Sequence, residues 1–98
     1  MRTVVISDLA KEDLYQISSY VAEHSPAAAK RLLKKFRKQF QLLTTFPQLG
    51  RARDDLAIGV RCLVMDGYLI FYQLDDKTLE IWRIRHGAQD LSGWLSDL

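Results

Sequence analysis

The strongest constraint on the fold is a break between two amphipathic segments in the first half of the chain. Ser25 followed by Pro26 favours a helix start, because serine caps the first turn and proline lacks only an N–H that would be unpaired there. The sequence therefore predicts an antiparallel pair of helices over residues 8–24 and 26–46. Apolar residues recur at helical spacing in both, at Ala10, Leu14, Ile17 and Val21 in the first and at Ala29, Leu33, Phe36, Phe40 and Leu43 in the second.

Two helices with one apolar stripe each need further cover, which the remaining segments supply as strands. Residues 60–65 and 68–74 flank Asp66-Gly67, a favoured two-residue hairpin turn, and residues 79–86 follow as another strand. A short β-branched run over residues 2–6 precedes Ser7, which caps the first helix. We predict one α+β domain over residues 1–98, of order β-α-α-β-β-β, with the N-terminal helical hairpin packed on a small antiparallel sheet and the first strand at its edge. A short helix over residues 89–98 is also predicted.

Composition disfavours several kinds of site and location. The lone Cys62 excludes an intrachain disulfide and suits a reducing cytosol, and the longest apolar run, residues 68–72, is far shorter than the roughly 20 residues that span a bilayer. His24 and His86 lie far apart without the spacing of a metal site, and the glycines do not form a phosphate-binding loop. We therefore expect a cytoplasmic protein without membrane association, metal or cofactor.

The charge is unevenly distributed although the net charge is only +2. Residues 26–46 contain no acid, and such a cluster attracts an anionic partner, although solvated side chains balanced by acids elsewhere in the fold explain it equally well. The six basic residues of this segment are Lys30, Arg31, Lys34, Lys35, Arg37 and Lys38.

Strand alternation suggests which side chains lie opposite the helices. Trp82 and Ile84 form the bulkiest apolar pair of the last strand, so we expect their face to meet the helices, together with Val60, Cys62 and Val64 of the earlier strand. The opposite, open face then carries arginines among apolar residues. The predicted target-binding surface comprises Arg51, Arg53, Arg61, Arg83, Arg85 and His86.

Three phrases carry a family resemblance that extends over nearly the whole chain. They are residues 45–61, which begin Thr45-Phe46-Pro47-Gln48-Leu49-Gly50-Arg51; Tyr68-Leu69-Ile70-Phe71-Tyr72; and residues 83–91, which begin Arg83-Ile84-Arg85-His86-Gly87. Together they resemble the toxins of the ParE branch of the ParE/RelE superfamily of bacterial toxin–antitoxin modules. The resemblance implies a RelE/ParE-like fold and a non-enzymatic toxin that inhibits DNA gyrase and so DNA replication. It also implies neutralisation by a cognate, ParD-like antitoxin with a DNA-binding N-terminus, and no sequence-specific nucleic-acid binding by the toxin itself.

Two alternatives stay open at this point. Members of the RelE branch are ribosome-dependent endoribonucleases, whose metal-free chemistry needs a base, an acid and cations that hold the phosphate. The arginines and His86 fit some of these roles, but that branch typically places a tyrosine in the C-terminal tail, and no tyrosine follows Tyr72. The other alternative is an attenuated toxin that acts mainly as a co-repressor with its antitoxin.

The open face also predicts where an antitoxin binds. Apolar residues among arginines suit an acidic, amphipathic segment that folds on binding as a helix plus an added strand. The predicted antitoxin groove comprises Arg61, Leu63, Met65, Leu79, Ile81, Arg83 and Arg85.

Overall fold

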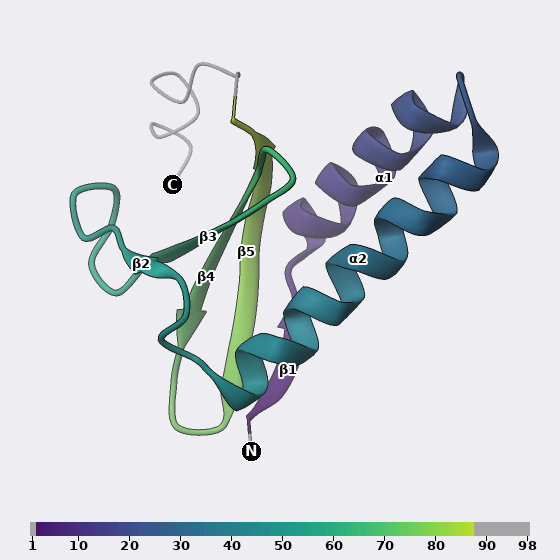
Figure 1. Cartoon of the computed structure of the whole chain (residues 1–98). Helices are drawn as coiled ribbons and strands as arrows, with labels where there is room; N and C mark the ends of the chain where they lie inside the picture. Colours follow the sequence, from purple (N-terminus) through teal and green to yellow (C-terminus); the bar gives the residue numbers. More distant parts are fainter. Residues whose placement is uncertain (1, 88–98) are drawn as a thin grey trace.

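The computed structural model, which describes residues 2–87, has two layers, with a helical hairpin on one face of a twisted sheet (Figure 1). The predicted order of elements is confirmed, with one short strand added. The elements are β1 (Thr3–Ile6), α1 (Asp8–Ala22), α2 (Pro26–Thr45), β2 (Arg51–Ala52), β3 (Arg61–Met65), β4 (Tyr68–Leu74) and β5 (Thr78–His86). The helix predicted over residues 89–98 lies outside the described residues.

Both helices begin where the sequence predicts. The hydroxyl oxygen of Ser7 accepts a hydrogen bond from the backbone N–H of Ala10 at 3.0 Å, and that of Ser25 accepts one from Ala28 at 3.1 Å. Pro26 occupies the first turn of α2, where no N–H is needed. Neither α1 nor α2 is long and apolar enough to cross a membrane.

The sheet has the strand order β1-β5-β4-β3-β2. β1 pairs in parallel with β5, so the first and last strands of the described chain lie side by side, and the other neighbours are antiparallel. Asp66 and Gly67 both have positive φ, 50° and 81°, which is the geometry of the predicted hairpin turn between β3 and β4. The two-residue strand β2, which pairs with β3, was not predicted.

The core between helices and sheet corrects the predicted faces of two strands. Met65, Leu79 and Ile81 were expected on the open face, but all three are buried against the helices, and Leu63 packs against the same cluster. The other buried members of this core are Ala10, Phe36, Phe40, Leu43, Ile70, Tyr72 and Ile84. These four residues therefore do not form an exposed groove.

A second, smaller cluster lies on the opposite face of the sheet, beneath the segment over residues 53–60. Val60, Cys62 and Phe71 are buried there, and Trp82 packs beside them, although Val60, Cys62 and Trp82 were predicted to face the helices. Val64, predicted to point the same way, is exposed. A bulge explains the error in β5: Phe71 pairs with Arg83 and Tyr72 with Ile81, so Trp82 has no partner across the ladder and the alternation changes phase at this residue.

Candidate functional site

The six residues of the predicted target-binding surface do not come together in the structure. They lie in four places. Arg83 forms a buried ion pair, and Arg61 contacts the loop after α2. Arg51 and Arg53 border a hollow on the face of the sheet opposite the helices, here called the second face, and Arg85 and His86 line a cleft beside α1. Whether any of them contacts a target stays a prediction.

Arg83 is a buried structural residue. Its Nε and Nη2 donate to the carboxylate of Asp13 in α1 at 2.9 and 3.1 Å, and the side chains of Arg83 and Asp13 are 10% and 8% exposed. The expected open-face position of this arginine is therefore wrong. Sequence analysis missed Asp13 as its partner, although Asp13 falls between Ala10 and Ile17 on the apolar stripe of the first helix, at spacings of three and four residues.

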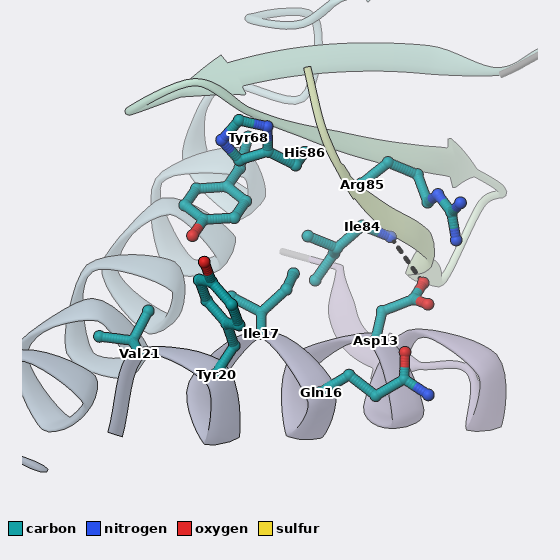
Figure 2. Close-up of a pocket in the computed structure, with 9 residues that line it drawn as sticks. All are labelled: Asp13, Gln16, Ile17, Tyr20, Val21, Tyr68, Ile84, Arg85 and His86. Carbon is teal, nitrogen blue, oxygen red and sulfur yellow. Dashed lines mark hydrogen bonds between the residues drawn. The ribbon is translucent and has the colours of Figure 1, made fainter. Parts of the chain in front are cut away.

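Asp13 also completes a row of contacts along the edge of β5. β1 ends at Ile6, and beyond it the backbone N–H of Ser7 donates to the carbonyl of Ile81 at 3.0 Å. The Ser7 hydroxyl donates to the carbonyl of Trp82 at 2.8 Å. The N–H of Ile84 donates to Asp13 Oδ2 at 3.0 Å, as Figure 2 shows. Side chains at the start of the helical layer thus satisfy the strand edge where β1 no longer covers it.

Arg61 and Tyr72 hold the loop that links α2 to β2. The Tyr72 hydroxyl donates to the carbonyl of Pro47 and accepts from the N–H of Gly50, both at 2.8 Å. Arg61 donates from Nε to the carbonyl of Gly50 at 2.9 Å and from Nη2 to that of Gln48 at 3.1 Å. These hydrogen bonds hold the main chain of residues 47–50 in place, so the Phe-Pro-Gln-Leu-Gly-Arg phrase of the sequence has a structural role.

Arg51 and Arg53 border a hollow of about 450 Å³ on the second face of the sheet, which Cys62, Val64 and Leu69 also line. Arg53 makes a bidentate ion pair with Asp55, at 3.0 Å for both contacts, and this hydrogen bonding holds the pKa of Asp55 below its ordinary value. Burial raises the pKa of the Cys62 thiol, which disfavours the thiolate that a nucleophile requires.

Arg85 and His86 line a cleft of about 440 Å³ between α1 and the end of β5, together with Tyr20 and Tyr68 (Figure 2). The rings of Tyr68 and His86 meet edge to face, with centroids 5.3 Å apart. Ile17, Val21 and Ile84 provide apolar lining. Sequence analysis missed both tyrosines, because one belongs to a helix and the other to a distant strand, and no local spacing connects them.

The cleft combines polar groups of kinds that bind ligands or transfer protons. Imidazole and phenol side chains exchange protons, and a guanidinium binds anions. Within residues 2–87 no group of three or more His, Cys, Asp or Glu side chains is arranged to hold a metal ion. The side chains described in this cleft can supply proton transfer and anion binding.

Comparisons with known proteins agree with this arrangement of elements. The chain is 33% identical over 89 residues to a protein named Toxin RelE2 from Caulobacter vibrioides, covering 91% of this chain and 99% of that one. It is 31% identical over 84 residues to Toxin ParE3 of the same organism, covering 85% of this chain and 84% of the other. A solved structure titled "Chromosomal ParDE TA system from P. aeruginosa" superposes with a TM-score of 0.74 at 24% identity, over 88% of this chain and 96% of that one, and it supports the fold.

Residues 4–91 match the family described as "ParE toxin of type II toxin-antitoxin system, parDE". This match covers most of the chain and takes in every helix and strand from α1 to β5. The protein is thus a toxin of the ParE/RelE superfamily and belongs to the ParE toxin family of type II toxin–antitoxin systems.

Proposed function

We propose that this toxin inhibits DNA gyrase by a protein–protein contact and does not cleave RNA. The observation that carries the proposal is the internal use of its arginines. Arg83 pairs with buried Asp13, Arg61 binds the carbonyls of Gln48 and Gly50, and Arg53 pairs with Asp55. A metal-free nuclease needs several cations directed at one phosphate beside an acid and a base, and these three arginines are directed at the protein itself. The match over residues 4–91 to the ParE family supports the same target.

The cleft beside α1 favours the RelE-type endoribonuclease as a second candidate. His86, Tyr68 and Tyr20 can transfer protons and line the same cleft as Arg85, and one of the similar proteins is named Toxin RelE2. This alternative makes the cleft catalytic, so variants of the residues that line the cleft test both functions.

One pair of assays separates the two functions. We expect the purified toxin to inhibit supercoiling by gyrase or to stabilise cleaved DNA, and to leave ribosome-bound mRNA intact. A gyrase inhibitor cleaves no RNA, so mRNA should stay intact with His86→Ala and Tyr68→Phe as it does with the wild type. A RelE-type enzyme would instead lose most of its cleavage on losing an acid or a base. Tyr15→Phe is the matched control, because Tyr15 is an exposed tyrosine of α1 that does not line the cleft. Cleavage of mRNA at defined sites by the wild type, lost in His86→Ala, would overturn the proposal.

A toxin of a type II system is paired with an antitoxin, and we propose that the antitoxin covers the second face of the sheet. The exposed apolar side chains of that region are Val64, which is 66% exposed, and Ile58, which is 90% exposed. Ile58 is presented by an ordered segment, since Gln73 donates to its carbonyl and Asp54 accepts from the N–H of Gly59. Such apolar anchors beside Arg51 and Arg53 suit an acidic, ParD-like segment.

Calorimetry with the C-terminal segment of the antitoxin tests this position. Val64→Asp should weaken binding at least tenfold, because a carboxylate in the interface repels an acidic segment and removes an apolar contact. Leu9→Asp is the control, since it places the same charge at another exposed apolar residue, in the first turn of α1. Equal binding by both variants and the wild type would place the antitoxin elsewhere.

A further inference from the structure

The second helix carries a continuous basic surface. Lys30, Lys34 and Arg37 follow one another at spacings of four and three residues, and Arg31, Lys35 and Lys38 form a parallel row beside them. All six side chains are exposed, whereas Ala29, Phe36, Phe40 and Leu43 bury the opposite side of the same helix. We call these six residues the α2 basic face, and along the helix axis it extends about 12 Å.

Within the described residues, this charge has little compensation nearby. Lys35 pairs with Asp66 across 2.8 Å, and no other ion pair involves a residue of the α2 basic face. α2 contains six of the chain's 14 lysines and arginines and none of its 12 acids, so outside this helix the acids outnumber the bases. Although the net charge is only +2, the positive potential of the molecule is thus concentrated along one helix.

The chemistry of the face indicates what it binds. Between Lys30 and Lys38 the apolar side chains are buried or half-buried, and the large exposed apolar residue of α2, Leu42, lies beyond them. Protein interfaces are depleted in lysine and depend on apolar or aromatic anchors, which this face lacks. A row of lysines and arginines without anchors suits a polyanion whose charges repeat at short intervals, such as the backbone of duplex DNA.

We propose that the α2 basic face binds the phosphate backbone of duplex DNA without reading its sequence. DNA binding by this face does not depend on which target the toxin has. Its consequence for gyrase rests on the proposed function, which is inhibition of that enzyme. Gyrase works on DNA, so a toxin that contacts the enzyme and the adjacent duplex together gains from both contacts at once. Lysines predominate in this face, and lysine contacts phosphate as a point charge without the paired geometry that reads a guanine edge.

Anisotropy measurements with two short DNA duplexes of unrelated sequence test the proposal directly. The wild type should bind both alike, and with five or six phosphates neutralised the logarithm of its affinity should fall with the logarithm of salt concentration with a slope of about −5. Lys34→Gln combined with Lys38→Gln removes two cations that have no ion-pair partner among the described residues, and should bring that slope to about −3 while weakening both duplexes equally. Glutamine keeps helix propensity close to that of lysine, and circular dichroism checks the fold.

Lys11→Gln combined with Lys77→Gln is the matched control, because it removes the same charge from exposed lysines of α1 and of the β4–β5 turn. The control should retain wild-type DNA affinity. Equal losses in both double variants would show a general effect of charge, and a wild type that does not bind DNA at low salt would also overturn the proposal. Loss of antitoxin binding in the α2 variant with DNA binding retained would assign the face to an acidic protein instead.

Supercoiling assays on the same proteins keep the two proposals apart. If the wild type binds DNA through α2 but does not inhibit gyrase, the gyrase proposal fails and the DNA-binding face stands. If the wild type inhibits gyrase and binds no DNA, the DNA-binding proposal fails and the gyrase proposal stands. If both are correct, the α2 double variant should inhibit gyrase less than the control does, and the difference should shrink as salt concentration rises.

Discussion

Asp13 joins α1 to β5 through both a side chain and the main chain, since its carboxylate accepts from Arg83 at 2.9 and 3.1 Å and from the N–H of Ile84 at 3.0 Å. Three hydrogen bonds satisfy a buried charge that would otherwise be costly to remove from water. This contact connects positions 70 residues apart in the sequence, and it fixes the helical hairpin at the end of the sheet where the cleft lies.

Breaking this pair from one side should destabilise the protein strongly. Asp13→Ala leaves the charge of Arg83 buried without this carboxylate and the Ile84 N–H without its acceptor, so the free energy of unfolding should fall by about 3 to 5 kcal/mol. Asp13→Leu combined with Arg83→Leu should cost less, because two apolar side chains replace both charges. Urea unfolding measures both. A single variant more stable than the double one would contradict the explanation.

Gly50 should not tolerate a side chain. A Cβ at this position would lie 2.6 Å from both Cε1 and the hydroxyl oxygen of Tyr72, so Gly50→Ala should lower the free energy of unfolding by about 1 to 3 kcal/mol through overpacking. Tyr72→Phe should cost a similar amount, about 1 to 3 kcal/mol, because the carbonyl of Pro47 and the N–H of Gly50 lose their partner. Tyr15→Phe, which removes an exposed hydroxyl, should change it by less than about 0.5 kcal/mol.

The arrangement of elements was predictable because local signals mark its boundaries. A serine caps each helix, Pro26 opens α2, and Asp66-Gly67 turns the chain between β3 and β4, and each of these signals acts over a few residues. The placement of β1 at an edge of the sheet also agreed with the prediction, although the sequence showed neither that its neighbour is β5 nor that this pairing is parallel.

The faces of the strands were not predictable by the same means. β3 is apolar on both sides from Cys62 to Met65, so its alternation offers no polar contrast there. Leu63 and Met65 pack in the core beside the helices, and Cys62 packs beside the segment over residues 53–60. In β5 the bulge at Trp82 changes the phase of alternation midway. The open-face position expected of Arg83 was wrong for the same reason, because this residue was placed by counting in twos and its partner Asp13 lies on another element.

Asp75 should make stability depend on pH in the acid range. Its carboxylate accepts from the backbone N–H groups of Thr78 and Lys77 and from the Thr78 hydroxyl, which lowers its pKa from the ordinary value of 3.8. A group whose pKa is lower in the folded state stabilises at neutral pH, and this contribution is lost as the pH falls through the folded-state pKa. Urea unfolding from pH 7 to pH 2 should therefore show a smaller loss for Asp75→Asn than for the wild type, and an identical loss would exclude this carboxylate as a contributor.

Repulsion between the charges of the α2 basic face should destabilise α2 itself. Like charges four residues apart, as in Lys30–Lys34 and Lys34–Lys38, each destabilise a helix by about 0.2 to 0.5 kcal/mol, and salt screens this repulsion. The melting temperature of the wild type should therefore rise with added sodium chloride. Lys34→Gln with Lys38→Gln should melt higher at low salt and respond less to salt, whereas Lys11→Gln with Lys77→Gln should follow the wild type.

The parallel pairing of β1 with β5 sets an order of events during synthesis. Thr3 pairs with Thr78 and Ile6 with Ile81, so β1 gains its partner only when nearly all of the described chain has followed it out of the ribosome. The helical hairpin and the antiparallel strands depend on nearer neighbours and assemble earlier, because closing a short loop loses less entropy than closing a long one. A nascent chain thus carries β1 unpaired until β5 has been made, and the sheet is completed in one late step that joins these two strands.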